Sequence, residues 1–370
     1  MKIAIIGIRG IPVVYSGYEI FSEIVSSQLV KNGHRVTVYG RSGYVVPEKK
    51  EYKGVRLIVL PSIRSKNFDT ISHSFLSTLH ACFQDYDVIL YLSVGNSIFS
   101  IVPRLFGKKT LVNVDGLDWK RKKWGWFAQK FLYYSEYLAT ILPNAIITDS
   151  IFIKNYYQQK YSKASYHIPY GGFVDSSMNE SMILKKYGLK KNQYFIWNGR
   201  LVPENHIEDL IQAFKRVKTN HRCVILGDDL YKSEYKKKLL NLAKGDKRFL
   251  FPGFVPHESA KALVKNSFAY VETKRSGGTH PSLVEAMSVG SLIICSDLHA
   301  NKEVLGERGI YYSMIKGSKN LKKRIEYVLL PEMKDKIEKK RMEVKKHAEE
   351  LYNWNRIVSQ YEYLFQKQVC

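Results

Sequence analysis

One stretch of the sequence combines the residue types that bind an anionic ligand. It runs from Gly277 to Gly290 and reads GGTHPSLVEAMSVG. The leading glycines let the backbone come close to a ligand, and Pro281 suits the first turn of a helix, where its missing N–H has no partner to lose. We expect Ser282 and Leu283 to offer free amides at the positive end of that helix, which favours binding of phosphate groups.

Glu285 follows one turn inside the predicted helix. A carboxylate at this point can accept hydrogen bonds from the hydroxyl groups of a ribose. The alternative interpretation is a well-capped loop and helix that carry a surface glutamate. The local pattern favours neither, so the elements around it must decide.

Arg200 stands just beyond a predicted strand in the second half of the chain. The apolar run 194–198 predicts this strand, and a helical pattern over residues 207–214 follows. A guanidinium here can reach a diphosphate and neutralise the charge that develops as a leaving group departs. As a surface arginine it would need no such role. Further strands are predicted at 224–226, 249–251, 269–272 and 291–295, which makes a second α/β series.

The first half of the chain opens with a strand at 2–6, the loop GIRGIP and a helical pattern at 20–29. A strand at 34–39 completes a βαβ unit of the doubly wound kind. The loop lacks the GxGxxG fingerprint, because Arg9 replaces the middle glycine and a second loop, residues 15–19, is predicted before the helix. NAD binding is therefore not expected. Further strands are predicted at 55–60, 88–92, 110–114 and 145–148.

No pattern in the sequence favours a metal site. Asp85-Tyr86-Asp87 resembles the DxD sequence of some metal-dependent transferases, but it precedes its strand instead of following it, which favours a helix-to-strand turn. The four cysteines form no CxxC pair and no metal-ligand spacing, which argues against a zinc site or a disulfide scaffold and fits a reducing cytosol.

Asp115 and Asp118 come directly after the strand predicted at 110–114, at the edge of the sheet where a first-domain site would lie. A carboxylate there can orient or deprotonate the hydroxyl group of an acceptor. The alternative is a loop of capping aspartates.

The stretch 119–134 mixes aromatic residues with lysines and arginines. A basic, aromatic amphipathic helix of this kind can lie in the headgroup region of an anionic membrane. The same composition could also pack on its own domain, or stack on single-stranded nucleic acid.

The chain has 370 residues, more than one hydrophobic core usually supports, so two domains are expected. Its 58 Lys and Arg against 34 Asp and Glu give a formal charge of +24, which implies an anionic partner. The N-terminal apolar run is too short for a signal peptide, and no apolar stretch reaches the roughly 18 residues that span a bilayer. We expect a cytoplasmic protein, in solution or peripheral on the inner face of the cell membrane.

Together these motifs resemble those of GT-B glycosyltransferases, specifically the large retaining family 4. The most specific pieces are Gly199-Arg200, Gly253-Phe254-Val255 and the run 281–287 followed by Gly290. The start GIRGIP with YSGYE, and the sequence DGLDWKR at 115–121, are similar to bacterial polysaccharide rhamnosyltransferases with a DUF1972-type N-terminal domain.

The resemblance implies an α/β fold of the GT-B type, with two Rossmann-like domains facing a central cleft and a C-terminal helix that packs back on the body. It implies an acceptor-binding domain at 1–170, a nucleotide-sugar-binding domain at 171–350 and a crossover helix at 351–370. The implied catalytic residues are Arg200, Asp115 and Glu285, and the implied acceptor contacts are Asp115, Asp118 and Trp119. The implied donor contacts are Gly10, Gly17, Glu204, Asn205, His206, Phe254, Val255, Thr279, His280, Pro281, Ser282, Leu283 and Glu285.

The sequence departs from the family pattern at three points. Family 4 usually has two glutamates eight residues apart, of which Glu285 matches the second and Gly277 occupies the place of the first, which commonly meets a sugar hydroxyl. The usual lysine six residues after the arginine is His206 here. A histidine often found on the first-domain loop is missing, and Asp115 stands roughly in its place.

The function that the resemblance implies is retaining transfer of a hexosyl group, L-rhamnose from dTDP-rhamnose, to a saccharide on a polyprenyl diphosphate, in the synthesis of O-antigen, capsule or exopolysaccharide. No metal or other cofactor is expected, since arginine and amides would take its place, and no nucleic-acid partner is expected. The alternatives are another UDP- or GDP-sugar as donor, a nucleotide-sugar epimerase, and a non-enzymatic nucleic-acid binder.

Overall fold

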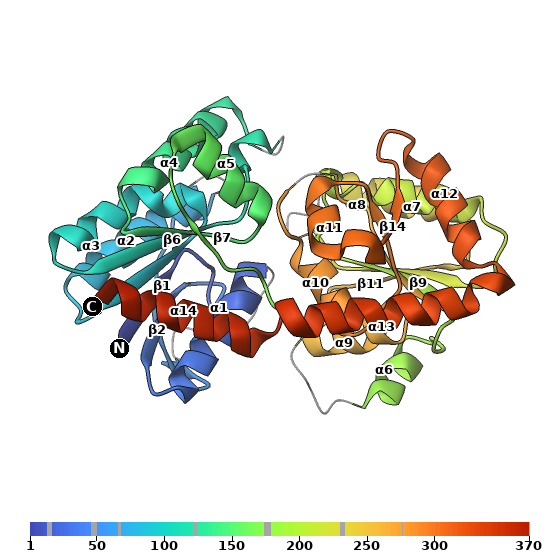
Figure 1. Cartoon of the computed structure of the whole chain (residues 1–370), viewed down its shortest axis with the longest axis horizontal. Helices are drawn as coiled ribbons and strands as arrows, with labels where there is room; N and C mark the ends of the chain where they lie inside the picture. The colour runs from blue at the N-terminus through green and yellow to red at the C-terminus, as the bar shows by residue number, and fades with distance from the viewer. Residues whose placement is uncertain are drawn as a thin grey trace. The chain divides into compact units, whose positions relative to one another are not determined.

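The computed structural model describes residues 1–12, 17–45, 50–65, 68–121, 124–173, 179–229, 234–275 and 277–369. The chain divides into two compact units: residues 1–170 together with 354–370 form the first, and residues 171–353 form the second (Figure 1). We also expected a division after residue 170. Four residues of the motifs quoted above, Tyr15, Ser16, Lys122 and Lys123, lie outside the described residues.

The first unit is built on a sheet whose described strands follow the order β3-β4-β2-β1-β5-β6-β7-β8. Neighbouring strands pair in parallel except β3 and β4, which are antiparallel. The strands predicted in this half are confirmed, whereas the two-residue strands β3 and β8 were not predicted. The bounds are β1 (Lys2–Ile6), β2 (Arg35–Arg41), β3 (Glu51–Tyr52), β4 (Val55–Leu60), β5 (Val88–Leu92), β6 (Lys109–Val114), β7 (Ala145–Thr148) and β8 (Tyr166–His167).

Helices cover both faces of this sheet (Figure 1). Apolar residues of α1 and α14 share one core with one face of the strands, and residues of α2, η1, α4 and α5 share a second core with the other face. The helices are α1 (Gly17–Lys31), α2 (Phe68–Cys82), η1 (Val94–Ser100), α3 (Ile101–Leu105), η2 (Asp118–Lys120), α4 (Trp126–Ile141), α5 (Ile151–Tyr161) and α14 (Trp354–Val369).

Helix α1 begins at Gly17, so the prediction of a loop is wrong for Gly17, Tyr18 and Glu19. Glu19 lies in the first turn of α1, where the helix dipole favours a negative charge. Its side chain is fully buried, and its Oε1 lies 3.5 Å from Nη1 of Arg9. The pattern of apolar residues did not show this start, because a buried charged residue holds the first turn.

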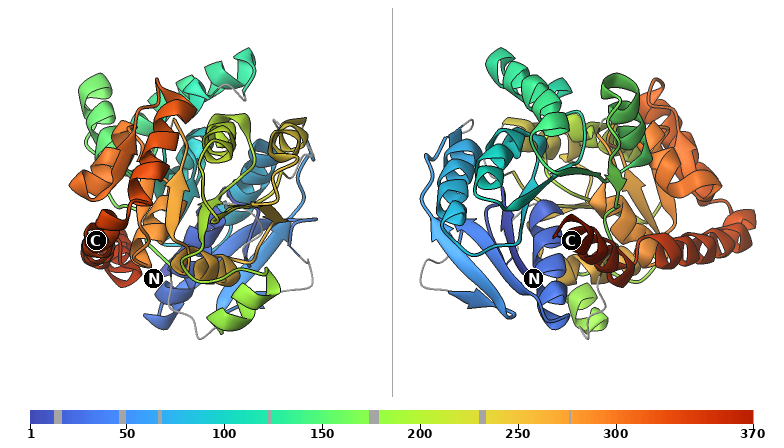
Figure 2. Two further views of the ribbon diagram at one scale, coloured as in Figure 1. Left: turned by 90° about the vertical axis from the view of Figure 1, so that its right-hand side faces the viewer. Right: turned by 60° about the vertical axis from the view of Figure 1, so that its left-hand side comes forward.

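Helix α14 completes the core of the first unit, as expected for a C-terminal helix that packs back on the body. It lies beside α1 in both sets of views (Figures 1 and 2). Nδ2 of the buried Asn113 donates a hydrogen bond to the hydroxyl oxygen of Tyr361 over 2.6 Å. The helix buries residues at helical spacing: Trp354, Ile357, Val358, Tyr361, Leu364 and Phe365.

The second unit holds a parallel sheet whose described strands follow the order β11-β10-β9-β12-β13-β14. From β9 the chain first proceeds to β10 and β11, and it then returns to β12 on the other side of β9. The point between β9 and β12 is therefore the switch point where ligands of doubly wound sheets bind. The bounds are β9 (Tyr194–Asn198), β10 (Arg222–Leu226), β11 (Phe249–Gly253), β12 (Ala269–Glu272), β13 (Ile293–Ser296) and β14 (Ile310–Tyr312), of which only β14 was not predicted.

Helices also cover both faces of the second sheet (Figure 1). Residues of α7, α8 and α12 share a core with one face, and residues of α9, α10 and α11 share a core with the other. No helix among the described residues is long and apolar enough to cross a membrane. The helices are α6 (Glu180–Lys186), η3 (Pro203–Asn205), α7 (Ile207–Lys215), α8 (Glu234–Ala243), α9 (His257–Lys265), α10 (Pro281–Ser288), α11 (His299–Leu305), η4 (Gly306–Arg308), α12 (Gly317–Val328), η5 (Pro331–Met333) and α13 (Lys334–Leu351).

The contact between Asn113 and Tyr361 predicts the effect of removing one hydroxyl group. Tyr361→Phe should lower the free energy of unfolding by about 1–3 kcal/mol, because the buried amide of Asn113 loses its acceptor. Tyr363→Phe is the matched control on the same helix, because Tyr363 is 64% exposed. This control should change the free energy of unfolding by no more than about 0.5 kcal/mol. Urea unfolding of both variants measures the difference, and equal effects would contradict the packing of α14 on the first unit.

Candidate functional site

Three glycine turns meet beyond the carboxyl ends of β9, β10 and β11. The amide of Gly199 donates to the carbonyl oxygen of Leu226 over 3.2 Å, and the amide of Gly227 donates to that of Gly253 over 2.9 Å. Gly227 has a φ of +115°, and a Cβ atom there would lie 1.7 Å from the carbonyl oxygen of Gly199. Only glycine fits at position 227, because any side chain would clash with Gly199. This close packing of the turns at Gly227 and Gly199 fixes the backbone that leads into Arg200.

The loop that begins at Arg200 is tied to the loop after β12 by a chain of hydrogen bonds. Nδ2 of Asn205 donates to the carbonyl oxygen of Arg200 over 2.6 Å. The hydroxyl of Thr273 donates to the carbonyl oxygen of Asn205 over 2.5 Å, and Nε1 of Trp197 donates to that hydroxyl over 2.9 Å. Asn205, predicted to contact the donor, thus has a buried side chain that supports the loop.

Glu272 and Lys274 form an ion pair at the carboxyl end of β12. Nζ of Lys274 lies 3.1 Å from Oε2 of Glu272 and 3.0 Å from Oγ of Ser282, in the first turn of α10. Glu272 is fully buried, which opposes its ionisation, but Lys274 and His280 outweigh burial and hold the pKa of Glu272 below its usual value. The sequence analysis did not single out this ion pair. Lys274 follows the end of a strand, as Arg200 does, so the same criterion would have found it.

Helix α10 begins at Pro281, as predicted, and Gly277 in the loop before it has a φ of +111°. The amides of Leu283 and Val284 donate to the carbonyl oxygen of His280 over 2.9 and 3.3 Å. The prediction of a free amide at Leu283 is therefore wrong, because His280 caps the helix and its carbonyl group closes the first turn.

Glu285 is buried, so the alternative of a surface glutamate is wrong. Its Oε1 lies 2.7 Å from Nε2 of His257, the first residue of α9. This contact fixes the orientation of the carboxylate. His257 had not been singled out, because nothing in the local sequence links it to a residue 28 positions away.

The other predicted donor residues differ in exposure and in the unit to which they belong. Phe254, directly after β11, is 53% exposed, whereas the side chains of Val255 and Leu283 are buried in the core. Gly10 and Gly17 belong to the first unit, where Gly10 packs against Val45. The remaining predicted donor residues lie in the loops that follow β9 and β12 in the second unit. Glu204 and His206 are partly buried, and Thr279 and His280 are buried.

In the first unit, carboxylates and phenols gather at the carboxyl edge of the sheet. Asp115 follows β6, and the buried Asp149 follows β7. Burial and the negative charge of Asp115 raise the pKa of both Tyr18 and Tyr170 well above the usual value, and Asp149 acts in the same direction. Asp149 was not predicted, although it occupies the same position after a strand as Asp115.

The predicted acceptor residues Asp118 and Trp119 lie in η2, directly after this edge. Oδ1 of Asp118 lies 3.0 Å from Nη1 of Arg121, and Nε1 of Trp119 donates to Oε2 of the buried Glu136 over 2.8 Å. Nζ of Lys160 lies 2.9 Å from Oε1 of Glu136. Both predicted side chains are therefore held in place by charged partners.

Helix α4 occupies most of the basic aromatic stretch. One of its faces, with Leu132 and Ala139, is buried in the core of the first unit. The other face exposes Trp126 (63%), Phe127 (82%) and Tyr134 (62%). Packing on the domain, one of the alternatives above, thus accounts for one face of this helix and leaves the aromatic face unexplained.

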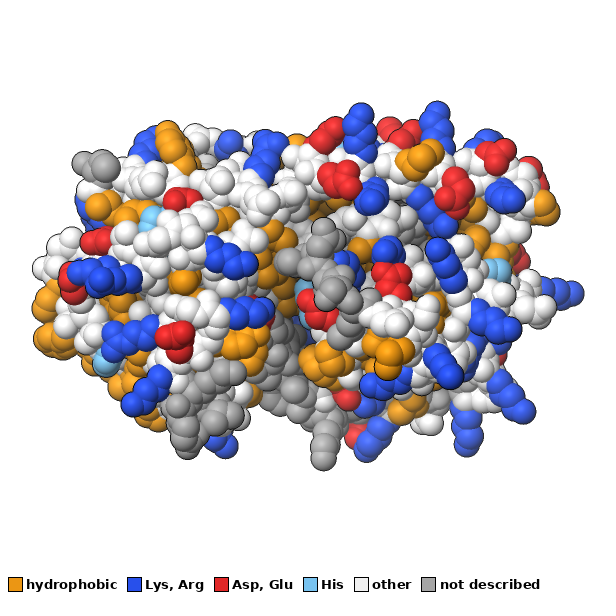
Figure 3. Space-filling model, turned by 90° about the horizontal axis from the view of Figure 1, so that it is seen from below, with side chains coloured by type: hydrophobic (Ala, Val, Ile, Leu, Met, Phe, Trp, Pro, Cys, Tyr) orange, Lys and Arg blue, Asp and Glu red, His pale blue; other side chains and the backbone are white. Residues whose placement is uncertain are grey.

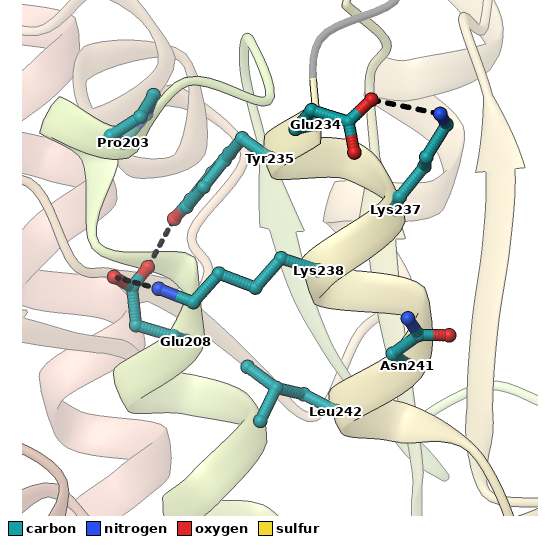
Figure 4. A pocket seen from close by; sticks show the side chains of 8 residues that line it. All are labelled: Pro203, Glu208, Glu234, Tyr235, Lys237, Lys238, Asn241 and Leu242. Carbon is teal, nitrogen blue, oxygen red and sulfur yellow. Dashed lines mark hydrogen bonds and ion pairs between the residues drawn. The ribbon is translucent and has the colours of Figure 1, made fainter.

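A hollow of about 840 Å³ lies between α7 and α8 (Figure 4). The hydroxyl of Tyr235 donates to the carboxylate of Glu208, and Nζ of Lys238 lies 3.6 Å from the same carboxylate. None of the predicted site residues lines this hollow. Its lining consists of Pro203, Glu208, Glu234, Tyr235, Lys237, Lys238, Asn241 and Leu242.

The predicted turn at Asp85-Tyr86-Asp87 is confirmed between α2 and β5. Oδ2 of Asp87 accepts a hydrogen bond from the amide of Lys2 over 2.7 Å, so this carboxylate joins the turn to β1. Among the residues that the structure describes, no group of three or more His, Cys, Asp or Glu side chains is arranged to hold a metal ion.

Comparison with known sequences finds glycosyltransferases over both halves of the chain. Residues 180–351 match the family described as Glycosyl transferases group 1, and residues 1–172 match a domain of unknown function, DUF1972. The O-antigen chain mannosyltransferase B of Escherichia coli is 24% identical over 132 residues, which cover only 35% of either chain. An uncharacterized glycosyltransferase of Methanocaldococcus jannaschii is 25% identical over 309 residues, 77% of this chain and 76% of its own length.

Comparison with solved structures shows the fold. Sucrose-phosphate synthase from Thermosynechococcus elongatus superposes with a TM-score of 0.82 at 18% identity, covering 99% of this chain and 98% of its own. HepE from Anabaena, solved with UDP-glucose, superposes with a TM-score of 0.80 at 16% identity. The superposition covers 99% of this chain and 100% of the HepE chain. WaaG, a glycosyltransferase involved in lipopolysaccharide biosynthesis, superposes with a TM-score of 0.73 at 12% identity. The superposition covers 97% of this chain and 98% of the WaaG chain.

These findings agree with the architecture of two α/β units built on largely parallel sheets. The predictions of the GT-B fold and of a transferase are confirmed. The chain is a glycosyltransferase with the GT-B fold.

Proposed function

We propose that the chain moves a hexosyl group, L-rhamnose from dTDP-rhamnose, onto a saccharide carried by a polyprenyl diphosphate, with the anomeric configuration retained. The observation that carries this proposal is the meeting of two elements at the switch point of the second sheet. Arg200 follows β9, and the loop into α10 follows the adjacent β12. Both features suit the diphosphate of a nucleotide sugar.

In the proposed reaction Arg200 and the start of α10 stabilise the departing diphosphate. They act more strongly in the transition state than in the ground state, because the negative charge grows as the bond to the sugar breaks. The acceptor attacks from the side of the leaving group, and the departing phosphate takes the proton of the acceptor hydroxyl. Asp115 orients that hydroxyl, and Glu285, held by His257, accepts hydrogen bonds from the ribose. Because the guanidinium and the helix start neutralise the charge, the proposal needs no metal.

The choice of rhamnose rests on the motifs of the first half, whose match to DUF1972 covers residues 1–172. The residue at position 277, where family 4 usually has a glutamate, is glycine, and the nearby carboxylate of Glu272 is buried in its ion pair with Lys274. The second candidate is therefore transfer from another UDP- or GDP-sugar. HepE, which shares the fold, binds UDP-glucose, and two relatives are named for mannosyl and N-acetylglucosaminyl transfer.

An anionic membrane surface is the proposed partner of the first unit, at the inner face of the cell membrane. The exposed aromatic face of α4 carries Lys130, whose Nζ lies 5.9 Å from the ring centre of Trp126. Leu105 (78% exposed) and the edge-to-face pair Phe83 and Phe106 are further exposed apolar side chains of this unit. Aromatic side chains flanked by lysines suit the headgroup region of a bilayer.

The basic residues on the face drawn in Figure 3 form no continuous groove. On the face drawn in Figure 3, Lys and Arg side chains are scattered among hydrophobic and acidic ones. A nucleic-acid binder would instead gather them along one continuous groove.

The experiment that tests the function gives the purified chain dTDP-rhamnose, UDP-glucose, UDP-N-acetylglucosamine and GDP-mannose, each with and without a polyprenyl-diphosphate-linked saccharide in vesicles. We expect release of dTDP and a longer saccharide only when dTDP-rhamnose and the acceptor are both present. Transfer from another sugar would support the second candidate. Conversion of a donor without acceptor would show an epimerase, and failure to consume any donor would contradict glycosyl transfer from these donors.

Removing the guanidinium should slow the reaction strongly. Arg200→Ala is expected to lower kcat by about two powers of ten or more, which is typical for loss of one charge-stabilising group. Arg216→Ala, at the exposed end of α7, is the matched control and should leave kcat unchanged. A kcat for Arg200→Ala equal to that of the control would exclude the assigned role.

Neutralising Glu285 should weaken use of the donor. Glu285→Gln keeps the shape of the side chain in its buried position. It should lower kcat/KM for the donor by about tenfold or more, because the neutral amide oxygen is a weaker hydrogen-bond acceptor than the carboxylate. Steady-state kinetics with varied donor measures this. An unchanged KM and kcat would remove Glu285 from the site.

The membrane proposal predicts weaker binding when the exposed aromatics of α4 are replaced. Trp126→Ser combined with Phe127→Ser should reduce sedimentation with anionic vesicles at least tenfold, since two large side chains lose their contact with the bilayer. Tyr363→Ser, an exposed aromatic on α14, serves as control and should bind like the original chain. Equal binding by all three proteins would place the membrane contact elsewhere.

A further inference from the structure

Lys274 is a lysine of the second unit that the proposed mechanism does not use. Its side chain is 13% exposed and is held between Glu272 and Ser282. We propose that Lys274 binds the diphosphate of the donor as a second cation beside Arg200, and that Glu272 positions it for this role. This inference rests on the proposed function, because it names a further contact in the same donor site.

The position of Lys274 is the first support. It follows β12 by two residues, as Arg200 follows β9 by two residues, and these strands are parallel neighbours at the switch point. The hydroxyl of Thr273 binds the carbonyl oxygen of Asn205, so the two loops are also joined directly. Both cationic residues therefore leave the sheet at the edge where a doubly wound fold binds its ligand.

The contacts of the ammonium group are the second support. Nζ lies 3.1 Å from Oε2 of Glu272 and 3.0 Å from Oγ of Ser282. An ammonium group has three hydrogen-bond donors, and within the described ranges of the chain these two oxygens are its acceptors. The third N–H is left for a ligand oxygen. Because Ser282 lies in the first turn of α10, that oxygen would also meet the positive end of the helix.

Glu272 has the contacts of a positioning residue. It is fully buried, and its carboxylate accepts from the amide and Nζ of Lys274 and, over 3.3 Å, from the hydroxyl of Tyr270. Taking an ion pair out of water is costly, and a hydrophobic pair often serves stability as well or better. A pair at this position is better explained by orientation of the lysine toward a ligand than by stability of the fold.

The chain offers a variant that removes the cation without leaving a lone buried charge. Lys274→Met alone would strand the carboxylate of Glu272, so the test combines Glu272→Gln with Lys274→Met, which leaves the net charge of the protein unchanged. The matched control combines Glu180→Gln with Lys265→Met, an ion pair of 2.7 Å between α6 and α9. Lys274→Arg keeps a cation and serves as the conservative variant.

The experiment measures the dissociation constants of dTDP and UDP, and of thymidine and uridine, for each full-length protein by calorimetry at one salt concentration. For the diphosphate that the original chain binds, Glu272→Gln combined with Lys274→Met should raise the dissociation constant about 10- to 100-fold. This is the loss of affinity expected when a hydrogen bond to a charged group is removed. The nucleoside should bind as before. The control pair should change neither constant, and Lys274→Arg should retain most of the diphosphate affinity.

The outcomes separate this inference from the proposed function. If the original chain binds neither diphosphate, the proposed function itself is contradicted. If it binds one and the double variant binds that ligand equally well, Lys274 is not part of the site and the proposed function stands. A merely structural role would lower the melting temperature of the double variant while the ratio of diphosphate to nucleoside affinity stays constant, and that result would also overturn the inference.

Discussion

The parallel pairing of β9 with β12 is the constraint on which the proposed donor site depends. Ala269 lies opposite Phe195 and Tyr270 opposite Ile196, which brings the carboxyl ends of two strands more than 70 residues apart in sequence to one edge. Every residue proposed to contact the diphosphate lies in a segment that follows one of these two strands at this edge. The hydrogen bonds through Thr273 and the close approach of Gly227 to Gly199 then fix the loops on either side.

Electrostatics explains why such an edge suits the proposed reaction. A departing diphosphate needs positive charge that is already in place, because moving water or side chains during the reaction would cost energy. The turn before Arg200 is held by neighbouring glycine turns, and the carbonyl of His280 closes the first turn of α10. Glu285 is likewise held by His257. The second unit thus holds these parts of the proposed donor site in fixed positions.

Much of the fold was predictable from the sequence, because runs of apolar residues mark buried parallel strands. The strands β3, β8 and β14 were missed, since two or three residues are too few to show a pattern. The start of α1 was missed because the buried Glu19 holds its first turn. Arg200 and α10 could be predicted from their place after a strand, but the contacts of Lys274 with Ser282 and of His257 with Glu285 depend on how loops and helices pack, which local sequence does not encode.

Hydrogen exchange on the full-length chain, with and without a saturating nucleoside diphosphate, tests the central claim most directly. The account predicts slower exchange in peptides that cover 199–206 and 272–285, the segments that leave β9 and β12 and enter α10. Peptides from the outer helices α7 and α8, which line the hollow in Figure 4, should exchange as before. Protection of α7 and α8 with none at the two loops would contradict a donor site at the switch point.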